Sequence, residues 1–280
     1  MRTSTKFVLA ALLALPVALS AQSFQPNLEA RLIGKPLYLR GFWSADDLHF
    51  DGSGKLISPS ETTAFTLSGM DVTKVQLHGD GLVIDGRRVG LELEQKDARA
   101  RVPLQTDPMQ PNSDEPIHIE IALAPGADYS KALDAIFADG LASLTPSLPP
   151  YWQVYASRNF LAPGDGLPMY PKKVEKAIDK PIRKGKDTIL RPTLAHSVAP
   201  DYPQAARNLQ YKASVVVSLV VGKEGNPTHL QLIRPAGLGL DEQAIAAVQH
   251  YTFNPGTQKG KPIPTDLNVI VVFGGAQPPL

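Results

Sequence analysis

Apolar and polar residues alternate with a period of two from Pro36 to Leu123, and glycine and aspartate interrupt the alternation. This pattern predicts short β-strands separated by turns. The predicted strands are Leu37–Arg40, Leu48–Phe50, Phe65–Leu67, Val75–Leu77, Leu82–Ile84, Val89–Leu93 and Ile117–Ile121. Turn-forming residues lie between them at Asp51–Gly54, Gly79–Gly81 and Asp85–Gly86, and the last two predict a tight antiparallel meander. We therefore expect an antiparallel β-rich domain over residues 24–145.

A helical period appears once in this region, from Tyr129 to Leu144. One face of that helix would be apolar, and it would carry Ala132, Leu133, Ile136, Phe137 and Leu141. Asp128 or Ser130 could cap its start, because short polar side chains accept hydrogen bonds from the first free N–H groups.

Residues 146–191 change in composition, being rich in proline throughout and in lysine in the second half. Such a segment is typical of a stiff, solvated linker, which fully extended would span on the order of 100 Å at about 3.1 Å per residue. Near its start, however, Tyr151, Trp152, Val154 and Tyr155 are apolar enough to pack onto a neighbouring domain. Only part of the linker is therefore expected to be free, and a disordered tail is expected at residues 276–280.

Residues 192–275 predict a second, smaller domain. Gln204–Asn208 favours a short helix after Pro203, and Ala213–Val221 and Pro227–Ile233 favour a hairpin across Gly225–Asn226. Asp241 is expected to cap a helix whose apolar stripe contains Ala244, Ile245, Val248 and Tyr251. Leu267–Phe273 is the last strand and is apolar on both faces. The predicted fold class is α+β, a β-rich domain followed by a small two-layer α/β module.

A three-stranded sheet of this kind must leave an exposed edge, and edges are normally protected by charges or proline. Asn268–Phe273 contains neither. Either this strand accepts an extended peptide from a partner, or a neighbouring segment or a second copy of the chain covers it. The residues alone favour neither alternative.

The order of motifs in this last third resembles the C-terminal domain of the TonB energy-transducer family. The motifs are Ala199–Arg207, the strand Ala213–Val221, the turn Gly222–Asn226, Gly239–Ala244, Tyr251–Pro255 and Asn268–Phe273. The resemblance implies that the last strand pairs with the TonB box, the periplasmic segment of an outer-membrane receptor, and that the Tyr-Pro segment lies beside that site. The partner-binding residues implied by the resemblance are Pro200, Tyr202, Pro203, Arg207, Asn268, Val269, Ile270, Val271, Val272 and Phe273. It also implies structural roles for Leu240, Asp241, Ala244, Phe253 and Pro255.

The N-terminus has the pattern of a secretory signal peptide. Arg2 and Lys6 precede an apolar stretch, Phe7–Leu15, which Pro16 ends before small residues up to Ala21. We expect residues 1–21 to be cleaved and the protein to reach the periplasm. The alternative is a short uncleaved anchor in the inner membrane.

Composition excludes several kinds of chemistry. The chain has no cysteine, which rules out disulfides, zinc–thiolate sites, thiol nucleophiles and a lipoprotein anchor. The net charge of +1 gives no indication of nucleic-acid binding. Asp51–Lys55 lacks the glycine that a phosphate loop requires, and His49, His78 and His118 are better explained as exposed strand residues than as metal ligands. No catalytic residue, metal or cofactor is predicted.

The sequence thus predicts a non-enzymatic periplasmic protein that binds outer-membrane receptors by strand addition and is linked to TonB-dependent transport. A transducer resembling TonB has a membrane anchor and a long spacer, whereas this chain has a signal peptide and a folded domain. A cleaved chain would therefore bind without transmitting force. The alternative is a soluble envelope scaffold that uses the module for association, including a homodimer.

Overall fold

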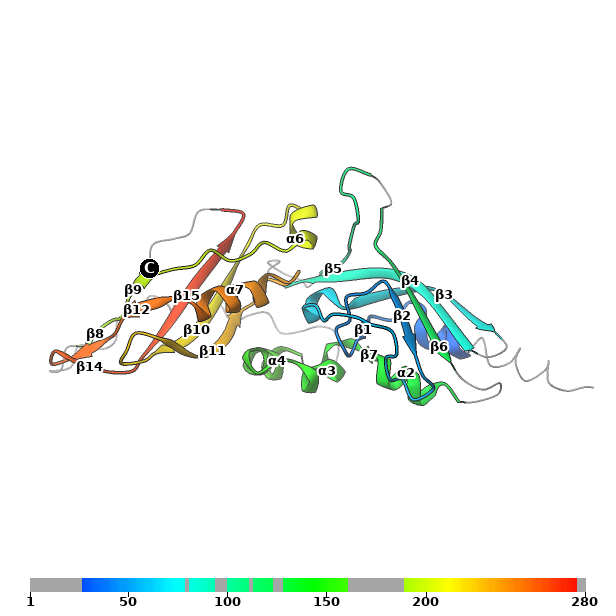
Figure 1. Cartoon of the computed structure of the whole chain (residues 1–280), viewed down its shortest axis with the longest axis horizontal. Helices are drawn as coiled ribbons and strands as arrows, with labels where there is room; N and C mark the ends of the chain where they lie inside the picture. Colours follow the sequence, from blue (N-terminus) through cyan, green and yellow to red (C-terminus); the bar gives the residue numbers. More distant parts are fainter. Residues whose placement is uncertain are drawn as a thin grey trace, which may run out of the picture.

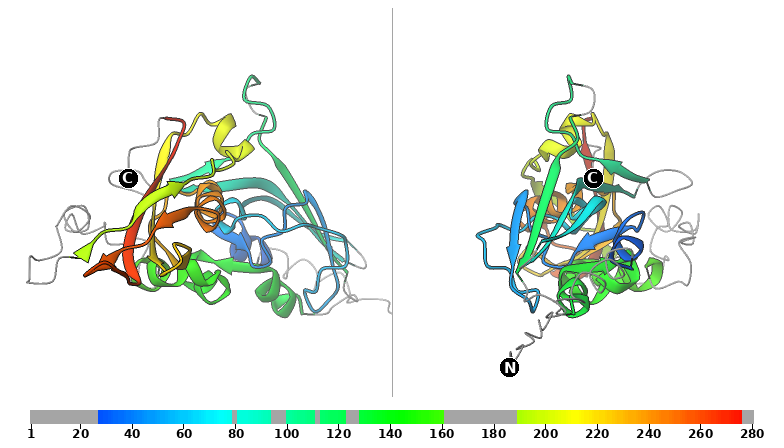
Figure 2. Two further views of the ribbon diagram at one scale, coloured as in Figure 1. Left: turned by 60° about the vertical axis from the view of Figure 1, so that its left-hand side comes forward. Right: turned by 90° about the vertical axis from the view of Figure 1, so that its right-hand side faces the viewer.

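The structure is a computed structural model that describes residues 27–78, 81–93, 100–110, 113–122, 128–160 and 189–275. The predicted signal peptide, most of the predicted linker and the tail at residues 276–280 lie outside these ranges. The β-rich part and the C-terminal part lie side by side along the long axis of the molecule (Figure 1). The turned views in Figure 2 show helices of residues 140–160 running along the lower side of both parts. The predicted α+β fold class is confirmed.

In the described part of the chain, the N-terminal sheet has seven strands in the order β2-β6-β4-β3-β1-β7, with β5 also paired to β4. Its strands are β1 (Leu37–Leu39), β2 (Asp47–Phe50), β3 (Gly69–His78), β4 (Gly81–Glu92), β5 (Ala100–Pro103), β6 (Pro116–Ala122) and β7 (Phe137–Asp139). All pairs are antiparallel except β2 with β6. A helical segment at residues 27–32 and helix α2 (Ser130–Ile136) contribute Leu28, Leu32, Leu133 and Ile136 to its core.

One predicted strand and one predicted turn are wrong. Phe65–Leu67 forms a 3-10 turn, η1, because Ser68 donates both its N–H and its hydroxyl to the Phe65 carbonyl, at 3.0 and 2.6 Å. Asp85–Gly86 is not a turn but lies inside β4, opposite a register shift between Val72 and Lys74 of β3. A bulge on the neighbouring strand thus accommodates residues that would otherwise favour a turn.

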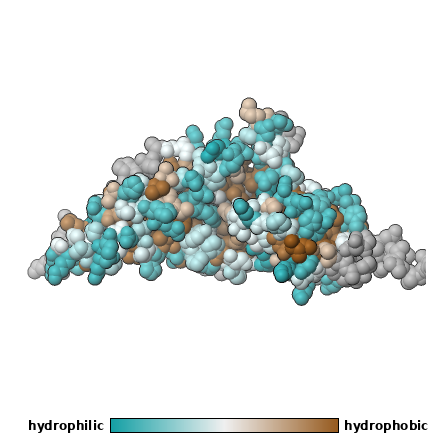
Figure 3. All heavy atoms as spheres, in the orientation of Figure 1, coloured by the Kyte–Doolittle hydropathy of each residue, from teal (hydrophilic) through white to brown (hydrophobic). Residues whose placement is uncertain are grey.

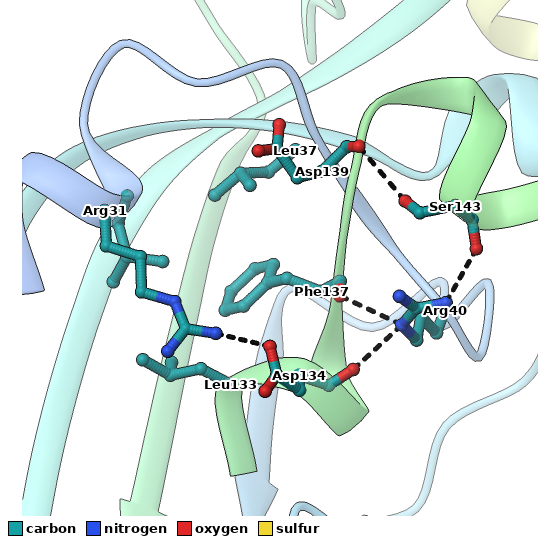
Figure 4. Close-up of a pocket in the computed structure, with 9 residues that line it drawn as sticks. Arg31, Leu37, Arg40, Leu133, Asp134, Phe137, Asp139 and Ser143 are labelled. Carbon is teal, nitrogen blue, oxygen red and sulfur yellow. Dashed lines mark hydrogen bonds and ion pairs between the residues drawn. The ribbon is translucent and has the colours of Figure 1, made fainter. Parts of the chain in front are cut away.

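The helix predicted from Tyr129 to Leu144 is interrupted. It consists of α2, the short strand β7 and helix α3 (Gly140–Leu144), because residues 137–139 pair with β1 instead of continuing the helix. Arg40 stabilises the interruption by donating Nε to the carbonyls of Asp134 and Phe137 and Nη1 to that of Ser143, each at 2.9 Å. Figure 4 shows these bonds beside a cavity of about 230 Å³, with the Arg31–Asp134 ion pair at its rim.

The C-terminal part contains the predicted three-stranded sheet, in the order β11-β10-β15. Its central elements are α6 (Gln204–Asn208), β10 (Ala213–Val221), β11 (Pro227–Arg234), α7 (Leu240–Gln249) and β15 (Thr265–Phe273). Helix α7 packs across β10 and β11. Short strands extend the module in two further small sheets: β8 (Ile189–Leu190), β9 (Thr193–His196), β12 (Thr252–Asn254), β13 (Thr257–Gln258) and β14 (Lys261–Pro262).

The two parts share a hydrophobic core. Residues 146–160, predicted to belong to the linker, lie in η2 (Thr145–Ser147), η3 (Pro150–Trp152) and α4 (Gln153–Asn159) and the residues next to them. Trp152 and Tyr155 are buried in one cluster together with Phe65 of the β-rich part and Val248 of α7. The Trp152 and Phe65 rings meet edge to face at a centroid distance of 4.7 Å. The packing predicted for these aromatic residues is therefore confirmed.

Candidate strand-pairing site

The last strand, β15, is a regular strand at the border of its sheet. It pairs with β10 over nine consecutive residue pairs, from Thr265–Val221 to Phe273–Ala213, with no register shift. Val269, Val271 and Phe273 are buried, while the side chains that alternate with them are half-buried. Among the described strands, β15 pairs only with β10, which makes it a border strand of the described sheet.

The opposite edge of the same sheet, β11, is built differently. It begins at Pro227, contains register shifts against β10, and holds His229 at a φ of 54°. Both η3 and α4 contact β11. Proline, irregular register and a covering helix are the usual means by which proteins prevent pairing at an edge strand. Within the described ranges, β11 is thus protected in several ways that are not seen at β15.

The Tyr-Pro segment lies beside the end of β15. The rings of Tyr202 and Phe273 are 6.1 Å apart, and the Tyr202 hydroxyl donates to the Tyr211 carbonyl at 2.6 Å. Arg207 donates Nη2 to the Tyr202 carbonyl at 2.9 Å and lies 5.8 Å from the centre of its ring. Burial raises the pKa of the Tyr202 hydroxyl, and the Arg207 charge opposes that rise.

The structure thus places Tyr202 beside both Arg207 and Phe273, the last residue of the strand. Pro203 is the N-cap residue of α6, and its ring approaches the loop at Gly239. Pro200 is half-buried in the segment that leads to them. Residues 268–271 lie further along β15, so the Tyr-Pro segment flanks the edge at one end.

Asp241 has a different role from the one predicted. The N-cap of α7 is Gly239, and Asp241 is a fully buried residue of the first turn. Its Oδ1 accepts the N–H of Ala236 and its Oδ2 that of Gly237, both at 2.8 Å. The carboxylate therefore organises the loop that precedes the helix, and does not cap the helix itself.

That loop joins the C-terminal part to the β-rich part through main-chain hydrogen bonds. Leu238 donates its N–H to the Leu91 carbonyl at 3.0 Å, and Leu93 donates to the Ala236 carbonyl at 2.8 Å. Gly239 also donates to the Thr66 hydroxyl at 3.0 Å. We name residues 236–239 the junction loop. Sequence reasoning missed this contact, although two closely spaced glycines between a strand and a helix were its available signal.

A cluster of histidines and carboxylates lies on the solvent side of the N-terminal sheet. His118 Nδ1 is 2.7 Å from Asp85 Oδ1, and its Nε2 is 3.4 Å from Glu120 Oε1. His49 Nδ1 is 3.1 Å from Glu120 Oε2. Among the described residues, no group of three or more such side chains is arranged to hold a metal ion. The hydrogen bond to Asp85 raises the pKa of His118, with Glu120 adding to the rise and burial opposing it.

No helix in the described ranges has the length and apolar character needed to cross a membrane. A comparison with curated proteins finds no match. Residues 198–274 match the family described as Gram-negative bacterial TonB protein C-terminal. They include α6, the three-stranded sheet and α7. Residues 198–274 are therefore a TonB C-terminal domain, a member of a non-catalytic family of the cell envelope.

Proposed function

We propose that this protein binds periplasmic segments of TonB-dependent outer-membrane receptors by adding them as a strand to β15, as part of TonB-dependent transport. The matched family supports the class of partner. The binding residues would be Asn268–Phe273, flanked by Pro200, Tyr202, Pro203 and Arg207. A guest strand gains main-chain hydrogen bonds, each contributing a net of about 0.5–1.5 kcal/mol.

The observation that carries this proposal is the difference between the two edges of the sheet. Pairing at β11 is hindered by Pro227, by the register shifts and by η3 and α4. A guest strand that pairs with β15 would lie along a regular nine-residue strand that contains no proline. Figure 3 shows a mostly hydrophilic face with apolar residues only in small groups, so that face offers no broad apolar docking surface. Main-chain pairing at the edge is the mode of binding that remains best supported.

We also propose that the protein acts in the periplasm without transmitting force, with residues 1–21 removed as a signal peptide. Homo-association through the same edge is the competing function, because a second β15 would meet the same unprotected strand.

Ile270→Lys tests the proposal. Ile270 is half-buried on the face of the sheet opposite Val269 and Val271, and a lysine there can extend to solvent while it discourages edge pairing. Labelled peptides spanning the N-terminal segments of TonB-dependent receptors are titrated with the mature chain by fluorescence anisotropy. We expect binding at least about tenfold weaker than that of the parent, about 1.4 kcal/mol.

Thr228→Lys is the matched control, because Thr228 is exposed on the opposite edge strand. It should bind as the parent does, and circular dichroism checks that both variants are folded. Equal affinity of Ile270→Lys and parent would exclude β15 as the site, and failure of the parent to bind any receptor peptide would refute the proposed function. A parent dimer that Ile270→Lys dissociates, without peptide binding, would establish homo-association instead.

A further inference from the structure

The two short strands that precede β15 form a projecting tip together with β8. We name residues 189–191 and 256–264 the distal tip; its strands pair in the order β14-β13-β8. β8 and β14 lie at the end of the molecule opposite the β-rich part (Figure 1). A Cβ added to Gly256 would clash with the Thr265 hydroxyl and lie 3.1 Å from the Leu190 carbonyl oxygen. The tip is therefore packed tightly against the start of β15.

The distal tip is positively charged. Arg191, Lys259 and Lys261 are all exposed. The chain has no aspartate or glutamate at residues 189–200 or 252–265, and the first carboxylate after the tip belongs to Asp266, inside β15. The surface of the tip therefore carries a local excess of positive charge.

The distal tip also exposes apolar side chains. Leu190 is 63% exposed, and Pro262 is exposed as well. Leu190 lies directly opposite Thr257 in the small sheet, and Thr257 lies opposite Pro262. Because directly opposed residues share a face of a sheet, Leu190 and Pro262 lie on the same side. The tip thus combines cations with exposed apolar groups, which favours the interface of an anionic membrane.

We propose that the distal tip binds the surface of a membrane that contains anionic lipids. Each lysine or arginine close to such a surface is attracted by the acidic headgroups. Leu190 would enter the boundary between headgroups and acyl chains, where its side chain leaves water. An anionic glycan would also attract the cations, but it offers no apolar phase for Leu190. Docking of the tip would hold the first residues of β15 close to the membrane, whether or not that strand receives a guest.

Binding of the mature chain to lipid vesicles tests the proposal. Vesicles of phosphatidylcholine alone are compared with vesicles in which about a third of the lipid is phosphatidylglycerol, and sedimentation measures the bound protein. We expect binding to the anionic vesicles, and we expect added salt to weaken it because salt screens the headgroup charge. Absence of binding to the anionic vesicles at low salt would overturn the proposal.

Lys259→Gln/Lys261→Gln removes two charges from the tip. Each cation near an anionic surface contributes about fivefold in affinity, so we expect this double variant to bind the anionic vesicles about 25-fold more weakly. Lys131→Gln/Lys212→Gln is the matched control, because its two lysines are exposed on α2 and just before β10. The two double variants have the same net charge and keep all other cations. Equal binding by both would exclude the tip as the site.

Leu190→Ser separates a membrane from other anionic partners. Loss of the apolar side chain should weaken binding to the anionic vesicles at least about fivefold. Binding to heparin, a soluble polyanion, should not change, because heparin has no apolar phase. A Leu190→Ser variant that binds the vesicles as the parent does would refute the membrane as the partner and indicate an anionic glycan or an acidic protein instead. Circular dichroism checks that all variants keep the fold.

Discussion

Replacing Gly237 with alanine should loosen the contact between the β-rich part and the TonB C-terminal domain. Gly237 has a φ of +90°, and a Cβ built on it would lie 2.0 Å from the Leu91 carbonyl oxygen and 3.0 Å from the Leu91 carbonyl carbon. These are main-chain atoms of β4, so the clash cannot be relieved by rotating a side chain. Either the end of β4 or the junction loop must move.

The expected loss has two components. Alanine at a left-handed φ costs about 1–2 kcal/mol. Separating the strands also breaks the hydrogen bonds from Leu238 to Leu91 and from Leu93 to Ala236, each with a net contribution of about 0.5–1.5 kcal/mol. Together these give a loss of about 2–5 kcal/mol in the free energy of unfolding.

Gly260→Ala is the matched control. Gly260 has a φ of +75° and nothing within 4 Å of its Cβ position, so it carries only the conformational cost of about 1–2 kcal/mol. Urea unfolding followed by circular dichroism gives both values. If Gly237→Ala costs no more than Gly260→Ala, the junction loop does not contact β4 as described.

Two further substitutions test other parts of the structure. Arg40→Met should lower the free energy of unfolding by about 2–4 kcal/mol, because three carbonyls at the α2–β7–α3 turn lose a charged donor. Urea unfolding measures the loss, with Lys131→Met as the control at an exposed position. Equal losses for the two variants would contradict the role given to Arg40. Asp85→Asn should lower the pKa of His118 toward its ordinary value of 6.5, as seen in an NMR titration of the imidazole. In the parent, the stabilisation from the His118–Asp85 pair is complete below pH 6.5 and is lost as the pH rises through the raised pKa of His118. If Asp85→Asn leaves the His118 titration unchanged, the Asp85 hydrogen bond is not the cause of the raised pKa.

Local sequence patterns predicted the C-terminal domain well. The bounds of α6 and β10 agree with the structure, because a short helix after proline and a long run of β-branched residues are set by neighbouring residues. The stretch Asn268–Phe273 of the last strand could also be identified, since its lack of charge and proline is visible in the sequence. The Tyr-Pro segment, placed beside it by family resemblance, does contact its end.

The patterns failed where hydrogen bonds outside the predicted helix decide the conformation. Tyr129–Leu144 has a helical period, yet residues 137–139 pair with β1 and Arg40 takes up the freed carbonyls. Asp241 looks like a helix cap, yet its carboxylate is turned to the junction loop. The partners of residues 137–139 lie about 100 residues away, whereas those of Asp241 are only four and five residues away. In both cases hydrogen bonds outside the predicted element outweigh the local preference, which is small for each residue.

The sequence by its motifs indicated a TonB-like domain in the last third of the chain, with a proline-free and largely apolar strand at Leu267–Phe273. The packing of η3 and α4 against β11 is visible only in the tertiary structure; it covers one border of the sheet, and β15 is the other border among the described strands. Trp152 illustrates the reason: its ring meets Phe65 and its N–H meets Glu242, partners 87 and 90 residues away. Burial and hydrogen bonding over such separations leave no periodic signal in the sequence.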